Sequence, residues 1–139
     1  WAIVEKNDKL LSDEAIRIEH YLWRNEKQNK SFVVKSGTKD AKRAVLSYKA
    51  IARGDRYTLL EINLETGRHH QIRCQLAAIG CPIKGDLKYG AKRSNPDGGI
   101  SLHARKIEFV HPVSKQQLSI IAPVPDDALW HDLEQQSMG

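Results

Sequence analysis

The sequence predicts an α+β fold with a mainly antiparallel mixed sheet and one inserted helix. Two observations carry this prediction. Apolar and polar residues alternate over several short segments separated by turn sequences, which is typical of half-buried strands. Near the middle of the chain, the apolar spacing changes to that of a helix. Because strand hairpins with one helix among them pack around an antiparallel sheet, the α+β class follows.

The first half of the chain holds most of the strand-like segments. Residues 25–30 form a polar turn, and residues 35–43 hold Ser36-Gly37 among basic residues, which is typical of a flexible cationic loop. Arg53-Gly54-Asp55 lies between two alternating runs and predicts the clearest antiparallel hairpin of the chain. The strands of this half are expected at residues 1–5, 16–18, 32–34, 44–52 and 57–65.

The inserted helix is predicted from three apolar residues after this hairpin. Ile72, Leu76 and Ile79 are spaced at i, i+4 and i+7, so they share one helical face. Thr66 is a suitable N-cap residue, and Gly80 suits the left-handed position that ends many helices. We therefore expect a helix whose apolar face packs on the sheet.

The rest of the chain returns to loops and strands. Residues 85–99 are rich in Gly, Lys and Asn, which predicts a loop. Further strands are expected near Leu102, at 107–109 and at 118–121, and residues 126–136 are expected to form a short terminal helix anchored by Trp130.

The composition excludes several classes of protein. The 139 residues are 40% hydrophobic and 28% charged, which is typical of a globular chain rather than a disordered one. No apolar run approaches the length of about 20 residues that a membrane-spanning helix needs. Two cysteines cannot form a disulfide scaffold, so we expect reduced thiols and a cytoplasmic location.

The charge is unevenly distributed along the chain. Residues 66–106 hold eight basic side chains against two acidic ones, a net charge of +6, whereas residues 107–139 hold one basic against five acidic, a net charge of −4. A one-sided positive field attracts polyanions, and nucleic acid is the commonest one in the cytosol. From charge alone, a solvated lysine-rich face remains the alternative.

Candidate chemistry concentrates at residues 64–73, Leu-Glu-Thr-Gly-Arg-His-His-Gln-Ile-Arg. Here a strand enters a helix through a Thr-Gly turn, so free backbone N–H groups and Arg68 lie at the positive end of the helix. His69 and Arg73 are spaced at i, i+4 and are expected to stack on one helix face. This predicts an anion site for a phosphate or a carboxylate; a capped helix with surface cations is the alternative.

Further motifs extend this pattern in order along the chain. Leu-Ala-Ala-Ile-Gly-Cys-Pro-Ile-Lys-Gly-Asp occupies residues 76–86, and Tyr89-Gly90, Leu102-His103-Ala104 and Phe109-Val110-His111-Pro112 follow it. Together with residues 64–73, these motifs resemble the RluA-type RNA pseudouridine synthases. The resemblance runs from about Lys42 to Val124, which is more than half of the chain. It implies the pseudouridine synthase fold.

The resemblance implies an isomerase that converts specific uridines of structured RNA to pseudouridine, with rRNA as the first expected substrate and tRNA as the next. It implies no cofactor, no metal, no membrane and no obligate protein partner. The family nucleophile is an Asp in a His-Arg-Leu-Asp motif, which these residues do not contain. We therefore expect residues 1–139 to be the C-terminal portion of a catalytic domain and to be inactive alone. The alternative is a non-catalytic RNA-binding module or a degenerate paralogue.

The resemblance also implies roles for particular residues. Arg73 matches the arginine that pairs with the nucleophilic Asp, and Leu102 matches the apolar residue that packs against the target base, with Ile72 beside it. Arg68 and His70 match positions near the RNA backbone or at the edge of the site. The family usually has Thr or Ser at the position of His69, so its role stays open, and Asp86 matches a structural loop position. The expected phosphate-binding rim consists of Lys84, Lys88, Lys92 and Arg93.

The remaining histidines and cysteines have simpler interpretations. His70 and Cys74 lie one helical turn apart, but no second close Cys/His pair accompanies them, so we expect no zinc site. His103 and His111 are expected to be hydrogen-bonded structural groups rather than acid–base catalysts.

Overall fold

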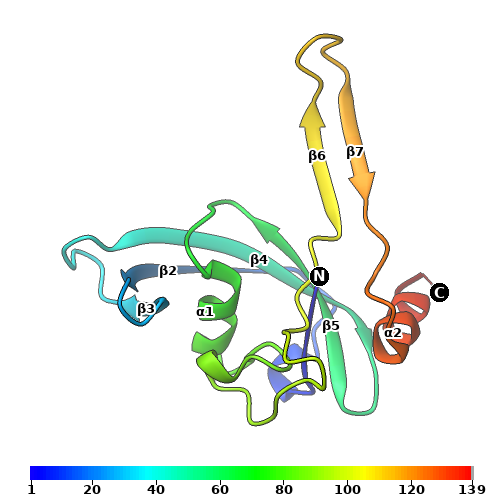
Figure 1. Cartoon of the computed structure of the whole chain (residues 1–139), viewed down its shortest axis with the longest axis horizontal. Helices are drawn as coiled ribbons and strands as arrows, with labels where there is room; N and C mark the ends of the chain where they lie inside the picture. Colours follow the sequence, from blue (N-terminus) through cyan, green and yellow to red (C-terminus); the bar gives the residue numbers. More distant parts are fainter. Residues whose placement is uncertain (139) are drawn as a thin grey trace.

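A computed structural model describes residues 1–138, and at positions 107 and 109 it describes the backbone only. The chain forms seven strands and two α-helices within the described residues, together with two short 3₁₀ helices (Figure 1). In chain order the strands and α-helices are β1 (Ala2–Glu5), β2 (Ile16–Asn25), β3 (Lys30–Val34), β4 (Lys42–Arg53), β5 (Tyr57–Leu64), α1 (Gln71–Ala78), β6 (Lys106–Val110), β7 (Gln117–Ile121) and α2 (Ala128–Met138).

Five of the strands form one sheet in the order β1-β5-β4-β2-β3, and β6 and β7 form a separate two-stranded sheet. Every pairing between these strands is antiparallel, so the predicted α+β class is confirmed. The predicted hairpin is β4–β5, in which Tyr48 lies opposite Ile62. Leu102 forms a single bridge to Ala2 rather than a strand of its own.

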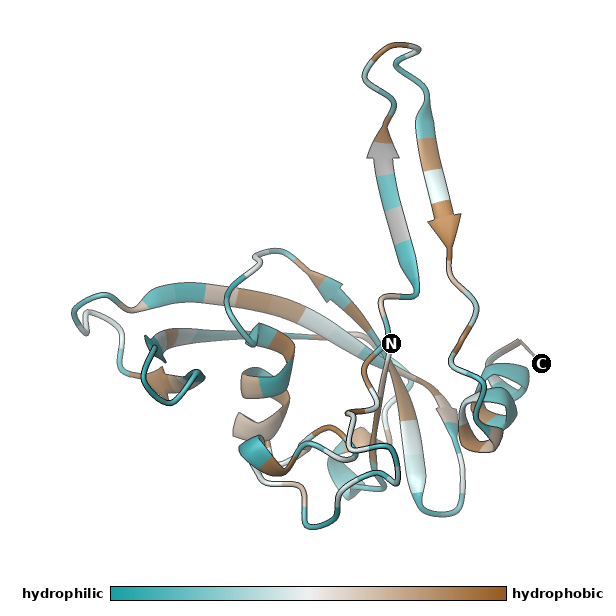
Figure 2. Ribbon diagram, in the orientation of Figure 1, coloured by the Kyte–Doolittle hydropathy of each residue, from teal (hydrophilic) through white to brown (hydrophobic). Residues whose placement is uncertain are grey.

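The larger sheet buries side chains on both of its faces. On one face, α1 contributes Leu76 to a cluster with Leu46 and Leu60, and all three side chains are inaccessible to solvent. On the other face, Leu59 joins a cluster with Trp130 of α2. A register irregularity in β4 between Ala50 and Ala52 accompanies the change of face. Figure 2 shows hydrophobic residues along the middle of β4 and β5 and hydrophilic ones in the β3–β4 loop.

The terminal helix is confirmed, with Trp130 as its anchor at 5% exposure. The helix begins two residues later than expected because Asp127 caps it. The Asp127 Oδ1 accepts hydrogen bonds from the backbone N–H groups of Leu129 and Trp130, at 2.9 and 3.3 Å. Among the described residues, neither α-helix reaches the length and hydrophobicity that crossing a membrane requires.

The β6–β7 hairpin projects away from the rest of the molecule (Figure 1). Val110, Ile120 and Ile121 are between 53 and 61% exposed on it. The body of the molecule, with the large sheet and α1, therefore contains the packed core from which the candidate site is built.

Candidate active site

The turn that leads from β5 into α1 differs from the sequence-based prediction. The helix begins at Gln71, and its N-cap residue is His70, in the left-handed conformation with a φ of 51°. Thr66 is not the N-cap, because the Val45 N–H donates to its Oγ1 at 2.9 Å and thereby ties it to β4. His69 precedes the helix, so the predicted stacking of His69 and Arg73 on one helix face is wrong. Gly80 does end the helix, with a φ of 84°.

Gln71 holds this turn against the sheet from a buried position. Its Oε1 accepts hydrogen bonds from the Thr66 hydroxyl at 2.8 Å and from the Arg68 N–H at 2.9 Å. Its Nε2 donates to the carbonyl of Val45 in β4 at 3.1 Å. Gln71 is 3% exposed, and these hydrogen bonds satisfy its buried polar atoms and fix the path of residues 66–70. The start of α1 is thus rigidly placed.

Arg73 in α1 forms a bidentate ion pair with Asp86. The Nε and Nη2 atoms of Arg73 each donate to one carboxylate oxygen of Asp86 at 2.8 Å. Asp86 is 1% exposed and the Arg73 side chain 19% exposed. Hydrogen bonding to Asp86 raises the pKa of Arg73 above its usual value, so the guanidinium stays charged. Asp86 has the structural role expected of it, and sequence reasoning missed Arg73 as its partner.

His70 joins this ion pair to Tyr89. The Arg73 Nη1 lies 3.2 Å from the His70 Nε2, and the Tyr89 hydroxyl lies 2.8 Å from the His70 Nδ1. Because arginine only donates, Nε2 must accept, and the ring is therefore neutral with its proton on Nδ1. Burial, and next the charge of Arg73, lower the pKa of His70 to about 4.

His69 stacks on His70, with ring centroids 3.8 Å apart. Its Nδ1 lies 2.9 Å from the Ser31 hydroxyl, and its Nε2 lies 2.9 Å from the Asn29 side-chain oxygen. Burial lowers the pKa of His69 as well. The side chain therefore ties the start of α1 to β3 and to the turn before it, which gives His69 a structural position.

Ile72 and Leu102 line the same cavity, as the prediction that both pack against one base requires. The cavity has a volume of about 780 Å³, within the usual range for small-molecule sites. Both of its cations are compensated, because Arg105 pairs with Glu134 at 2.9 Å and Lys106 pairs with Glu108 at 2.7 Å, and Glu61 adds a further carboxylate to the lining. Its other apolar lining comes from Trp1, Ile62, Leu64, Ala104 and Ile121.

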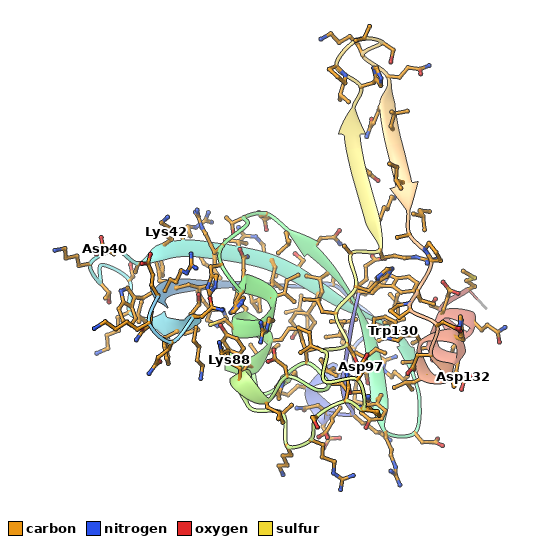
Figure 3. All side chains as sticks on the ribbon, viewed as in Figure 1. Asp40, Lys42, Lys88, Asp97, Trp130 and Asp132 are labelled. Atoms are coloured by element: carbon orange, nitrogen blue, oxygen red, sulfur yellow. The ribbon has the colours of Figure 1, made fainter. Side chains whose placement is uncertain are left out.

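The predicted RNA-binding residues do not all lie together. The Arg68 Nε donates to the carbonyl of Arg43 at 2.8 Å. The Lys88 Nζ donates to the carbonyls of Gln28 and Asn29, at 3.0 and 2.8 Å, so it lies beside the β2–β3 turn (Figure 3). Lys84, Lys92 and Arg93 instead line a second cavity, which is separate from the Leu102 cavity.

The other candidate ligands and catalysts have structural contacts. His103 Nε2 lies 3.2 Å from the carbonyl of Ala122, and His111 Nδ1 accepts hydrogen bonds from the N–H groups of Val113 and Ser114, so both are hydrogen-bonded as expected. That neither acts as an acid–base catalyst stays a prediction, since His103 also lines the Leu102 cavity. Burial raises the pKa of the Cys74 thiol to about 11. Within residues 1–138, no three His, Cys, Asp or Glu side chains are grouped so as to hold a metal ion.

The Leu102 cavity thus borders α1, the helix in which Asp86 fixes Arg73. A sequence model of the RNA pseudouridylate synthase family matches residues 1–78, which is more than half of the chain. The chain belongs to this family, and the predicted resemblance to its RluA-type members is confirmed.

Individual relatives agree with this assignment. The chain is 37% identical over 118 residues to an uncharacterized RNA pseudouridine synthase, YlyB, of Bacillus subtilis, covering 85% of this chain and 38% of that protein. It is 40% identical over 99 residues to the ribosomal large subunit pseudouridine synthase D of Xylella fastidiosa, covering 62% of this chain and 30% of that protein. The chain thus spans about a third of the length of these relatives.

A solved structure shows the same fold. Human RNA pseudouridylate synthase domain containing 4 superposes with a TM-score of 0.67 at 19% identity, covering 99% of this chain and 60% of that one. At this identity, the likeness supports the fold alone.

Proposed function

We propose that this chain is the C-terminal portion of a pseudouridine synthase catalytic domain, and that the whole protein isomerises specific uridines of structured RNA to pseudouridine. Ribosomal RNA is the first proposed substrate and tRNA the second, because one relative carries the name of a ribosomal large subunit enzyme. Free, buried cysteines suit a protein that works in the cytoplasm.

One observation carries this proposal: the two neighbouring residues Ile72 and Arg73 of α1 serve two different surroundings. Ile72 lines the Leu102 cavity, and Arg73 holds a carboxylate. A base must leave its stack before an enzyme can react with it, and it then needs an apolar slot. In this proposal the Leu102 cavity supplies that slot for a uracil, and Arg73 follows Ile72 on the helix that borders it.

The proposed role of Arg73 is to orient the nucleophilic Asp of the whole protein and to keep it ionised. Asp86 takes the Nε and Nη2 hydrogens of Arg73, and His70 takes one on Nη1. A guanidinium has five N–H donors, so two remain for a second carboxylate. Arg73 is thus able to bind the nucleophile without releasing Asp86, and Asp86 in turn fixes the guanidinium in place.

In the proposed isomerisation the Asp bonds transiently to the substrate, and the bond between uracil N1 and ribose C1′ breaks. The uracil turns and its C5 atom bonds to C1′; the C5 proton is lost, N1 gains a proton, and the Asp is released unchanged. Because residues 1–139 hold no His-Arg-Leu-Asp motif, we expect this chain alone to form no pseudouridine. Formation of pseudouridine in an rRNA transcript by residues 1–139 alone would contradict the assignment of the nucleophile.

Arg73→Lys in the full-length protein tests the role of Arg73. Lysine keeps the charge and loses the bidentate geometry, so we expect kcat for pseudouridine formation to fall about a hundredfold while the affinity for RNA changes little. Arg17→Lys is the matched control, because Arg17 lies in β2, away from α1, and forms an exposed ion pair with Glu65. An unchanged kcat in the Arg73 variant would remove Arg73 from the proposed site.

A further inference from the structure

A second cavity of about 780 Å³ lies at the other end of β1 from the Leu102 cavity. Leu102 bridges to Ala2 at the beginning of β1, whereas the second cavity is lined by Glu5 and Lys6 at its end and by Tyr57, the partner of Glu5 in β5. At about 3.3 Å per residue, Ala2 and Glu5 at the two ends of this strand are about 10 Å apart. The two cavities are therefore separate but lie on one ladder.

The second cavity is strongly positive. Its lining holds five basic side chains and a single acidic one, Glu5. Within the described part of the chain, none of the five basic side chains forms an ion pair with a carboxylate. Uncompensated cations around a concave surface attract polyanions. The five basic residues are Lys6, Arg56, Lys84, Lys92 and Arg93.

The wall of this cavity is a built structure rather than a loose loop. The Lys84 N–H donates to the Ile3 carbonyl at 2.8 Å, and the Lys84 carbonyl accepts from the Ser101 N–H at 2.9 Å. The Asn95 side chain accepts from the Lys84 Nζ at 2.6 Å and donates to the Ser101 hydroxyl at 3.1 Å. Gly85 has a φ of 86°, and a Cβ there would lie 2.7 Å from the Gly99 carbonyl oxygen.

We propose that this second cavity binds backbone phosphates of the RNA substrate, at nucleotides that flank the target uridine while its base occupies the Leu102 cavity. The inference rests on the proposed function and extends it, because it adds Lys6, Arg56 and Tyr57 to the RNA-binding surface and leaves out Lys88. The half-buried ring of Tyr57 lies 5.5 Å from the Lys84 Nζ, so an aromatic face borders the cationic lining. Single-stranded RNA sites combine these two features.

The test is the double variant Lys92→Ala with Arg93→Ala in the full-length protein, measured by fluorescence anisotropy with a labelled rRNA fragment. Loss of two phosphate contacts should weaken binding about tenfold near physiological salt and should reduce the slope of log K against log salt by about 1.4. In steady-state kinetics, KM for RNA should rise while kcat is kept, because the Leu102 cavity is untouched.

The matched control is Lys35→Ala with Lys39→Ala, which removes the same charge from the β3–β4 loop. Figure 3 shows the tip of that loop at Asp40, far from Asp97 in the loop that follows Lys92 and Arg93. An equal loss of affinity in both double variants would mean that net charge alone is responsible, and it would overturn the proposal. An unchanged salt slope in the Lys92/Arg93 variant would overturn it as well.

Two further results distinguish RNA phosphate binding from binding of a small anion, and a failure of this proposal from a failure of the proposed function. Inorganic phosphate alone should bind weakly, in the millimolar range; micromolar binding that the double variant abolishes, with RNA affinity unchanged, would assign the cavity to a small anion and overturn the proposal. If the wild-type protein binds the RNA but forms no pseudouridine, the proposed function fails, and the salt slope still decides whether the second cavity holds phosphates.

Discussion

The two cavities of this protein have similar volumes but differ in charge: one is compensated and the other is positive. In the Leu102 cavity, Arg105 and Lys106 are matched by carboxylates, and the remaining lining is largely apolar. In the second cavity, Lys92 and Arg93 belong to a group of cations that no carboxylate in the described residues neutralises. A compensated apolar cavity suits an uncharged base, and an uncompensated cationic one suits phosphates. The two proposals therefore place the target base in the Leu102 cavity and the phosphates of flanking nucleotides in the second cavity.

Arg73 of α1, the helix whose Ile72 lines the Leu102 cavity, forms a compensated ion pair with Asp86, and breaking this pair should have the largest effect. Asp86→Ala leaves a partly buried guanidinium without its partner, so we expect the free energy of unfolding to fall by about 3–5 kcal/mol in urea titrations. Combining Asp86→Ala with Arg73→Met removes both charges and should recover part of this loss.

The matched control for Asp86→Ala is Asp13→Ala. Asp13 pairs with Arg53 at 2.8 Å, but its side chain is 86% exposed, so little change in stability is expected. Equal stability of the Asp86 and Asp13 variants would show that burial does not distinguish the two pairs.

His70, which contacts Arg73, makes the surroundings of the Arg73–Asp86 pair sensitive to acid. Its pKa is about 4 in the folded protein, below the usual value of 6.5, so between these values the unfolded chain binds the proton and the folded chain does not. Stability should therefore fall as pH decreases from 6.5 towards 4, by about 2 kcal/mol after allowance for the partial exposure of the ring.

His70→Gln should make the pH dependence of the urea midpoint flatter over this range, because the titrating group is gone. His131→Gln is the control, since His131 is exposed in α2. A His70 variant with the same pH dependence as the wild-type protein would contradict the neutral, half-buried state of His70.

Leu102→Ala tests the Leu102 cavity, the more apolar of the two cavities. Removing the side chain that lines the proposed base slot should lower kcat/KM for pseudouridine formation at least about tenfold, with the salt slope of RNA binding unchanged. Leu11→Ala, at a leucine that is 65% exposed and lines neither cavity, should have no effect. A reduced salt slope in the Leu102 variant would mean that the two cavities are not independent.

The smallest effect is expected for stability in the uncompensated region. Lys92→Ala with Arg93→Ala should change the free energy of unfolding by no more than about 0.5 kcal/mol, because both side chains are exposed and unpaired in the described residues. A loss of several kcal/mol, measured by urea titration, would show that these cations hold the loop together rather than stand ready for a ligand.

Periodicity in the sequence predicted the elements that repeat a local pattern. The β4–β5 hairpin and the face of α1 that holds Leu76 follow from spacing alone. The start of α1 did not follow from spacing. The Thr66 hydroxyl could have accepted a hydrogen bond from the first turn of the helix, but it accepts one from the N–H of Val45 in β4 instead. A capping residue is predictable only where no strand competes for it.

The site was predictable in part, for a similar reason. The motifs identified Arg73 and Leu102, but the partner of Arg73 is Asp86, thirteen residues away and beyond the end of the helix. Lys6 and Arg56 of the second cavity come from segments far from Lys92 in the sequence, and only the strand ladder brings them together. Contacts of this kind depend on tertiary structure and leave no local signal.

The central claim is that the full-length protein makes pseudouridine in RNA, and mapping pseudouridines in cells that lack the gene tests it most directly. We expect one or a few defined positions, in rRNA first and in tRNA next, to lose the modification and to regain it when the wild-type gene is returned but not when the Arg73→Lys gene is. An unchanged pseudouridine map in all RNA from these cells would contradict the claim.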